Sequence, residues 1–244
     1  MHGQNFPDLF LGIGCIKRRN DEVSQEQVEV IAIDGPTASG KGTIAGIVAQ
    51  RLGYHYLDSG ALYRLAALTC LDRQVDLLDE AACAKAASDI EPIFRDGRIE
   101  LFGRDVTEAI RAEIVGITAS KIATLPSVRQ ALFDLQRRAK KAPGLVADGR
   151  DMASVVFPDA RLKVFLTASA ESRAERRYRQ LIQKGISANL TSLTEDLAER
   201  DRRDRERKTA PLVPMPDSRI LDSSNLTIEE TVETVLSWWR EVNQ

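Results

Sequence analysis

This 244-residue sequence has few of the residues that build disulfide frameworks or metal centres. It contains three cysteines, Cys15, Cys70 and Cys83, and two histidines, His2 and His55. An odd number of cysteines without ligand spacing indicates reduced thiols rather than a disulfide scaffold or a zinc site. A chain of this length buries about 70–75% of the surface that its unfolded form exposes, so it needs neither device to fold.

Long hydrophobic runs and a large net charge are also absent. No apolar stretch approaches the ~20 residues needed to span a bilayer. The short apolar stretch from Leu9 to Ile16 lacks the basic residues before it and the small-residue cleavage site after it that mark a signal peptide. A net charge of -2 gives no general affinity for nucleic acids. We therefore expect a cytoplasmic protein that binds neither membrane nor nucleic acid.

One contiguous segment carries a strong functional signal. The apolar run V-I-A-I ends in Asp34, a glycine-rich loop follows, and residues 43–52 have helical spacing. A strand, a glycine-rich loop and a helix in this order are typical of a phosphate-binding P-loop, whose backbone N–H groups bind phosphate oxygens. The residues expected to bind the nucleotide are Gly35, Pro36, Thr37, Ala38, Ser39, Gly40, Lys41, Gly42 and Thr43.

Two side chains of this loop have predicted roles. Lys41 can reach the β- and γ-phosphates, and the hydroxyl of Thr43 can bind Mg²⁺. Because Gly42 separates them, the pattern G-x-x-x-x-G-K-G-T resembles the P-loop of nucleoside monophosphate kinases rather than that of GTPases. The structural alternative is a glycine turn that happens to carry a lysine. The agreement of strand, spacing and helix argues against it.

The rest of the chain alternates strand and helix patterns. Strands are expected at Val28–Ile33, Tyr54–Leu57, Leu145–Ala147, Leu162–Leu166 and Arg219–Leu221. Helices are expected at Thr43–Leu52, Ala61–Leu71, Ser127–Ala139, Glu171–Lys184, Leu193–Arg207 and Ile228–Val242. This alternation predicts an α/β protein in which helices cover both faces of a parallel sheet.

One section interrupts the alternation. Residues Ile90–Phe94 and Arg98–Phe102 predict a hairpin, with Asp96-Gly97 as its turn, and Ala81–Ser88 is helical by propensity. We interpret residues 81–126 as a small inserted domain. The predicted organisation is an N-terminal extension of undetermined role at 1–27, a core at 28–80 and 127–244, and a lid within that core at about 173–208.

Polar clusters follow two further strands. D-S-G-A-L-Y-R spans Asp58 to Arg64, and A-D-G-R-D-M ends with Asp148 to Met152. The carboxyl ends of parallel strands meet at the edge where open α/β proteins bind ligands. A helix cap with a surface arginine would explain the first cluster, and a capped turn the second. Because both follow strands, as the glycine-rich loop does, binding is the favoured interpretation.

An arginine-rich segment runs from Glu199 to Arg207. At about 100° per residue, one ~100° arc of this helix holds Arg200, Arg203, Asp204 and Arg207, which could clamp a phosphate and a hydroxyl. Asp201, Arg202, Arg205 and Glu206 fit a solvated helix face. Arg173, Arg176 and Arg177 form a similar cluster on the preceding helix, for which surface and functional roles are both open. Between these helices, K-G-I-S-A-N-L-T-S resembles a lid tip.

Taken together, G-P-T-A-S-G-K-G-T, D-S-G-A-L-Y-R, A-D-G-R-D-M and E-R-D-R-R-D-R-E-R resemble the motifs of the bacterial cytidylate kinase family. The resemblance runs from about Val28 to the C-terminus. It implies a P-loop NTPase-type five-stranded parallel sheet, an inserted monophosphate-binding domain and a helical lid. It also implies a (d)CMP kinase of pyrimidine nucleotide metabolism that uses ATP and Mg²⁺, and we expect it to act as a monomer.

The resemblance also implies residue roles. Ser120, Arg129 and Asp151 would contact the cytosine, and Arg64, Arg150 and Arg207 would hold the acceptor phosphate. Ser59 and Tyr63 would line the same pocket, while Arg200 and Asp204 would hold the ribose. The residues expected to carry catalysis are Lys41, Arg150, Arg207 and Arg64.

Three rival functions are weighed against this one. A P-loop hydrolase or switch GTPase would need a guanine-reading N-K-x-D motif, which does not occur. A nucleic-acid-binding role for the arginine-rich helix is disfavoured by the acidic residues within it. A kinase for UMP, AMP or another small acceptor is the nearest alternative.

Overall fold

The structure is a computed structural model that describes residues 28–95, 97–183, 185 and 187–244. Its central sheet has five parallel strands in the order β2-β6-β1-β7-β8. They are β1 (Glu29–Asp34), β2 (His55–Asp58), β6 (Gly144–Gly149), β7 (Leu162–Thr167) and β8 (Arg219–Asp222). The five strands predicted from the sequence are confirmed, each within two residues at either end.

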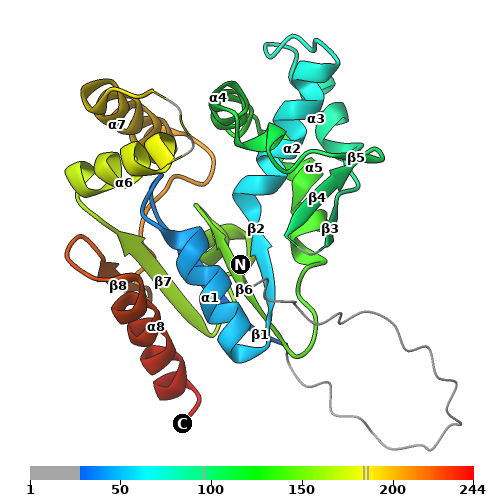
Figure 1. Ribbon diagram of the computed structural model, residues 1–244. Helices are drawn as coiled ribbons and strands as arrows, with labels where there is room; N and C mark the ends of the chain where they lie inside the picture. The colour runs from blue at the N-terminus through cyan, green and yellow to red at the C-terminus, as the bar shows by residue number, and fades with distance from the viewer. Residues whose placement is uncertain (1–27, 96, 184, 186) are drawn as a thin grey trace, which may run out of the picture.

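Side-chain alternation along β1 divides the core between the two faces of the sheet. Ile31 and Ile33 belong to one apolar cluster, and Val30 and Ala32 to the other. The first cluster is covered by α1 (Lys41–Leu52) and α8 (Ile228–Val242), and the second by α2 (Ser59–Asp72) and α5 (Pro126–Arg137) (Figure 1). Because the strands are parallel, the loops after β1, β2 and β6 emerge at the same edge of the sheet, its carboxyl edge.

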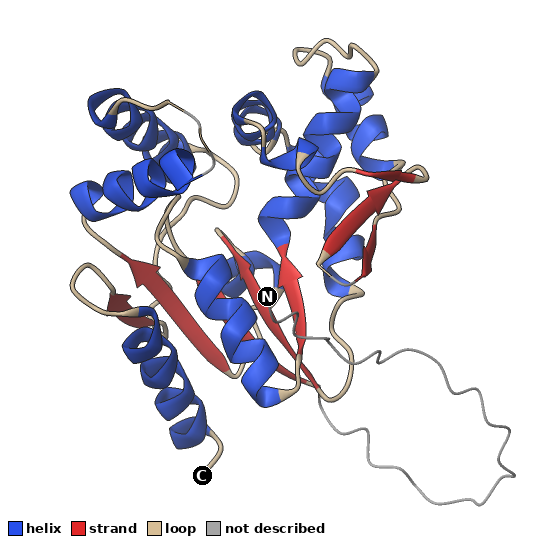
Figure 2. Ribbon diagram, in the orientation of Figure 1, coloured by secondary structure: helices blue, strands red, loops and turns tan. Residues whose placement is uncertain are grey.

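The inserted region adds a second, three-stranded sheet, set apart from the first (Figure 2). Its elements are α3 (Glu80–Ser88), β3 (Ile93–Arg95), β4 (Arg98–Leu101), β5 (Arg104–Asp105), a 3₁₀ turn at Ala109–Arg111, and α4 (Glu113–Ile122). The predicted hairpin is confirmed, since β3 and β4 pair antiparallel. Its turn residue Asp96 lies outside the described residues. Helix α4 was not predicted, because its β-branched residues disfavour a helix that packing against α2 stabilises.

Helices α6 (Ala170–Gln183) and α7 (Leu190–Glu206) pack on each other and form the region predicted as a lid. In Figure 1 they stand on one side of the sheet's carboxyl edge, with α2 and α4 on the other. The placement of Asp201 on a solvated face is wrong: it is buried and its carboxylate lies 2.7 Å from the guanidinium of Arg173. The reason is that α7 turns this side toward α6.

Two segments interpreted from the sequence lie wholly or partly outside the described residues. The predicted extension, residues 1–27, lies outside them, as do Lys184 and Ile186 of the predicted lid tip. No helix within the described ranges is long and apolar enough to cross a bilayer.

Candidate active site

A cleft of about 620 Å³ opens at the carboxyl edge of the central sheet. Its walls come from the glycine-rich loop, α2, α4, the segment after β6, and the two lid helices. The residues to which the glycine-rich loop or the family resemblance gave a role all line this cleft except Gly35 and Pro36, whereas Arg203 of the predicted clamp does not. The structure thus brings together residues that are spread over more than 170 positions of the chain.

Two glycines shape the loop at the inner end of the cleft. A side chain at Gly35 would place its Cβ 2.0 Å from the carbonyl oxygen of Leu166, so only glycine fits beside β7. Gly40 has φ 89° and directly precedes α1, in the left-handed region that favours glycine. The loop can therefore fold tightly over the N-terminus of α1, where the helix dipole and free N–H groups favour phosphate.

Lys41 is held inside this loop. Its Nζ donates a hydrogen bond to the carbonyl oxygen of Pro36 at 3.1 Å, and the side chain is buried. Burial, followed by the nearby charge of Arg150, lowers the pKa of Lys41 to about 7. A phosphate bound in the loop would place a negative charge beside Lys41 and so stabilise its ionised form.

The extra glycine between Lys41 and Thr43 lies beside a tyrosine–carboxylate pair. A Cβ at Gly42 would lie 3.4 Å from the hydroxyl of Tyr56 and 3.8 Å from the carboxylate of Asp148. Those two groups share a hydrogen bond of 2.6 Å, donated by Tyr56. Burial, with the nearby carboxylate of Asp58, raises the pKa of Asp148 to about 7. A Cβ at Gly42 would be in ordinary van der Waals contact with this pair, so the available space does not by itself require glycine here.

The opposite wall of the cleft is built on α2. Asp58 caps this helix by accepting a hydrogen bond from the N–H of Ala61 at 2.9 Å. Arg64 crosses toward the inserted region, where its guanidinium donates to the carbonyl of Ile110 in the 3₁₀ turn at 2.7 Å. A Cβ at Gly116 would lie 2.9 Å from that guanidinium, so α4 approaches Arg64 through a glycine. Arg64 is therefore not the surface arginine of the alternative interpretation.

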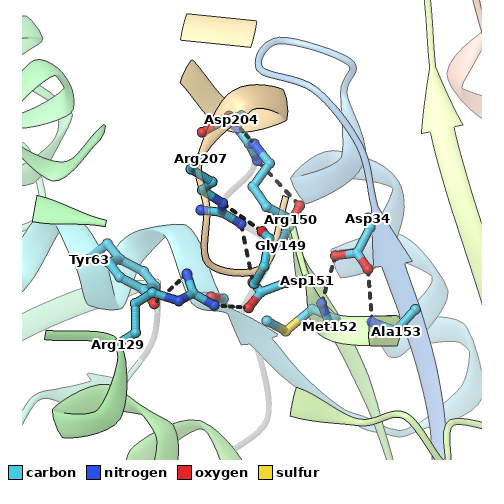
Figure 3. Close-up of polar contacts among 12 residues, drawn as sticks. Asp34, Tyr63, Arg129, Gly149, Arg150, Asp151, Met152, Ala153, Asp204 and Arg207 are labelled. Atoms are coloured by element: carbon cyan, nitrogen blue, oxygen red, sulfur yellow. Dashed lines mark hydrogen bonds and ion pairs between the residues drawn. The ribbon is translucent and has the colours of Figure 1, made fainter. Parts of the chain in front are cut away.

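Asp151 lies at the centre of a buried charged cluster (Figure 3). Its carboxylate forms an ion pair with Arg129, whose other Nη donates to the hydroxyl of Tyr63 at 3.4 Å. Arg207 approaches the other carboxylate oxygen, with its Nη2 4.0 Å from Asp151 Oδ1. This Nη2 is buried and makes no hydrogen bond within the described residues. A buried guanidinium nitrogen without an acceptor marks a place where a ligand oxygen fits.

Arg150 connects three segments around the cleft. Its Nε donates to the carboxylate of Asp204 on α7, and its Nη2 donates to the hydroxyl of Thr37 in the glycine-rich loop, both at 2.7 Å. Burial opposes ionisation of Asp204, but the guanidinium of Arg150 outweighs it, so the pKa of Asp204 lies below its ordinary value. Arg150 therefore links the loop to the lid region directly.

Comparisons with known proteins agree with this geometry. The family model for cytidylate kinase matches residues 31–241. The chain belongs to the cytidylate kinase family. It is 59% identical over 215 residues to a cytidylate kinase of Burkholderia thailandensis, covering 88% of this chain and 94% of that protein. It is 58% identical over 211 residues to a cytidylate kinase of Bordetella bronchiseptica, covering 86% of this chain and 95% of that protein.

The lid arginines of this cytidylate kinase family member take separate partners. Arg203 donates to the hydroxyl of Ser120 at 3.0 Å, and Arg176 donates to the carbonyl of Ser39 at 3.1 Å. Arg207 lies one residue past the end of α7, so its position is set by an extended backbone and not by the predicted helical arc. The arginines of the arc therefore do not act as one clamp: Arg200 and Arg207 line the cleft, and Arg203 lies outside its lining.

Two contacts of residues that line the cleft were not predicted from the sequence. The carboxylate of Glu113 on α4 lies 2.9 Å from Arg177 and 3.9 Å from Arg200, joining the inserted region to the lid helices. Thr37 was assigned to the loop, but its hydroxyl was not expected to hold Arg150. No local signal marks Glu113, because the helix that carries it could not be recognised from the sequence.

Proposed function

We propose that this chain transfers the γ-phosphate of ATP to CMP or dCMP, giving ADP and CDP or dCDP. The observation that carries the proposal is a cleft that joins a phosphate-binding loop to a buried Arg129–Asp151 pair and to the Nη2 of Arg207, which has no hydrogen-bond acceptor among the described residues. The first feature suits a nucleoside triphosphate. The other two suit a smaller nucleotide with a polar base and a phosphate.

The chemistry needs alignment more than a general base. The second pKa of a monophosphate is about 6, so the attacking oxygen is largely ionised near neutral pH. Lys41 and the loop N–H groups hold the triphosphate, while Arg64, Arg150 and Arg207 offset the repulsion between the two anions. Fixing the two phosphates in line and stabilising a loose transition state supply most of the acceleration. Lid residues that cover the transferring group exclude water.

The acceptor base is read by a buried carboxylate. An ionised Asp151 only accepts hydrogen bonds, so it suits the exocyclic amino group of cytosine and opposes the carbonyl oxygen of uracil. We assign Ser120 and Arg129 to the rest of the cytosine edge. Ser59 and Tyr63 line the same pocket, and Arg200 and Asp204 hold the ribose.

We assign a Mg²⁺ ion to the hydroxyl of Thr43. No group of three or more His, Cys, Asp or Glu side chains in the described part of the chain could hold a metal by itself. The assignment rests on ligand chemistry: Mg²⁺ keeps several waters and binds through few protein ligands together with substrate phosphates, so a hydroxyl beside a phosphate-binding loop suits it. When bound, the ion neutralises charge on the transferring phosphoryl group. We also propose that the protein is a cytoplasmic monomer with the domain organisation given above.

A coupled assay of ATP consumption tests the function. It compares CMP, dCMP, UMP and AMP as acceptors, with a reaction that lacks any acceptor. We expect fast turnover with CMP and dCMP, slower turnover with UMP and AMP, and almost none without an acceptor. Equal ATP consumption with and without CMP would indicate a hydrolase, and faster turnover with UMP or AMP would overturn the assigned substrate.

A further inference from the structure

Asp34 is a buried carboxylate to which the catalytic scheme gives no role. It ends β1 and directly precedes Gly35, yet only 4% of it is exposed. Alternation along β1 turns its side chain to the same face as Val30 and Ala32, toward the larger apolar cluster. Such a charge needs hydrogen-bond partners to be tolerated.

Both partners come from the segment that carries the acceptor-reading residues. One oxygen of Asp34 accepts the N–H of Met152 at 2.9 Å, and the other accepts the N–H of Ala153 at 2.8 Å (Figure 3). These are the first two N–H groups of a π-helical turn that spans Met152–Val156. Asp34 therefore caps a turn that begins 118 residues further along the chain.

The residue that would ordinarily cap this turn is Asp151. It occupies the N-cap position, where an aspartate commonly accepts an N–H group of the helix that follows it. Its side chain makes no such hydrogen bond here. Its carboxylate faces Arg129 and Arg207 instead, inside the cleft.

We propose that Asp34 is a positioning residue for acceptor recognition: it caps the turn at Met152 in place of Asp151 and leaves the Asp151 carboxylate free to read the base. The inference rests on the proposed function, because it concerns how the acceptor is chosen. Through these hydrogen bonds β1, which leads into the glycine-rich loop, is also linked to the segment that carries Asp151, the residue that faces the acceptor in the proposed function.

The isosteric variant Asp34→Asn tests this role. An asparagine keeps one acceptor oxygen but turns an NH₂ donor toward the second N–H, so the turn loses part of its cap. Misplacement of a binding group by about 1 Å can cost on the order of 100-fold in rate. We expect kcat/KM for CMP to fall about 10- to 100-fold, a much smaller fall for UMP, and a KM for ATP within about twofold of the original.

Two further variants separate positioning from stability. Asp79→Ala removes a different helix cap, since Asp79 accepts the N–H of Ala82 at the start of α3 and does not line the cleft. It should change the melting temperature without changing kcat/KM for either acceptor. In an Asp151→Ala background, Asp34→Asn should alter the CMP-to-UMP ratio by less than about twofold, because its effect passes through Asp151.

If Asp34→Asn lowered kcat/KM for CMP and for UMP by the same factor, so that their ratio did not change, the positioning role would be overturned. Asp34→Ser, which keeps a hydroxyl acceptor, replaces asparagine if that variant does not fold. Failure of both to fold would assign Asp34 to structure alone and overturn the proposal. The original enzyme is measured in the same series: if it does not prefer CMP to UMP, the proposed substrate is wrong, which is distinct from a failure confined to Asp34.

Discussion

The two halves of the cleft are built in different ways. The half that we propose binds the phosphoryl donor, Gly35 to Thr43, consists of nine consecutive residues whose shape depends on backbone and glycine. The half that we propose binds the acceptor depends on side chains that come from α2, α5, the segment after β6 and the end of α7, namely Arg64, Arg129, Arg150, Asp151 and Arg207. Backbone N–H groups recognise any phosphate, whereas a network of charged side chains can distinguish one acceptor from another. The choice between acceptor nucleotides should therefore depend on the acceptor half, whereas the rate of phosphoryl transfer should depend on both halves.

The largest expected effect comes from Lys41, the one charged side chain of the donor half. Lys41→Met should reduce kcat by roughly 10³-fold or more, since it removes a cation placed at the transferring phosphoryl group. The fall in kcat should be the same with CMP and with UMP, because the donor half does not contact the acceptor base. The matched control is Lys163→Met, because Lys163 pairs with Asp217 away from the cleft. Retention of a tenth of the activity would disprove the role of Lys41.

A backbone test of the donor half uses two glycines. Gly35→Ala forces a Cβ against the Leu166 carbonyl, so the loop must shift, and a fall in activity of about 100-fold is expected. Gly46→Ala, in the interior of α1, meets nothing within 4 Å and should leave kinetics unchanged while stabilising the helix by up to about 1 kcal/mol. If both variants retained full activity, the shape of the loop would not depend on Gly35.

In the acceptor half, Arg207→Lys should lower kcat/KM about 10- to 100-fold for CMP and UMP alike. The guanidinium of Arg207 donates from Nε to the carbonyl of Ala210 and keeps Nη2 for a ligand, and an ammonium group cannot serve both. Arg205→Lys, on the exposed face of α7, is the control and should be neutral. A change in the CMP-to-UMP ratio would contradict the assignment of Arg207 to the phosphate.

The smallest expected effect concerns the pH dependence of stability. The pKa of Lys41 falls from its ordinary value of 10.5 to about 7 on folding. Between these two values the unfolded chain holds a proton that the folded chain has released, so Lys41 makes the free energy of unfolding rise with pH across this window. Lys41→Met should remove that rise. The stability gained over the original enzyme should therefore be larger at pH 7 than at pH 9.5.

Urea unfolding of both nucleotide-free proteins at the two pH values measures this difference. Cys70 titrates in the alkaline range but is common to both chains, so its contribution cancels in the comparison. A stability difference that is constant with pH would show that Lys41 keeps its ordinary pKa in the folded protein.

The difference between the contiguous donor half and the dispersed acceptor half also explains which parts of the site could be predicted from the sequence. The donor half is contiguous, so strand, loop and helix could be predicted from residue types alone. The acceptor half is assembled from distant segments, and Ser120 and Arg129 were found only through the family resemblance, because a single serine or arginine on a helix has no local signature. The lid residue Asp201 was misplaced for a related reason: its partner Arg173 lies on another helix.

Contacts across long sequence separations set the remaining limits. Helix α4 could not be recognised because its β-branched residues have low helix propensity and the sequence does not reveal that it packs on α2. Neither Glu113, which α4 carries, nor the cap that Asp34 provides had a signal in the sequence. Each depends on a contact that exists only after the chain has folded.

The most direct test of selectivity in the acceptor half is the ratio of kcat/KM for CMP to kcat/KM for UMP, measured for the original enzyme and for Asp151→Ala. A site with buried polar groups rejects a mismatched hydrogen-bonding partner more strongly than an apolar pocket does. We expect the original enzyme to favour CMP strongly, and Asp151→Ala to lose much more activity with CMP than with UMP, so that the ratio narrows. Equal losses with both acceptors would show that Asp151 does not read the base.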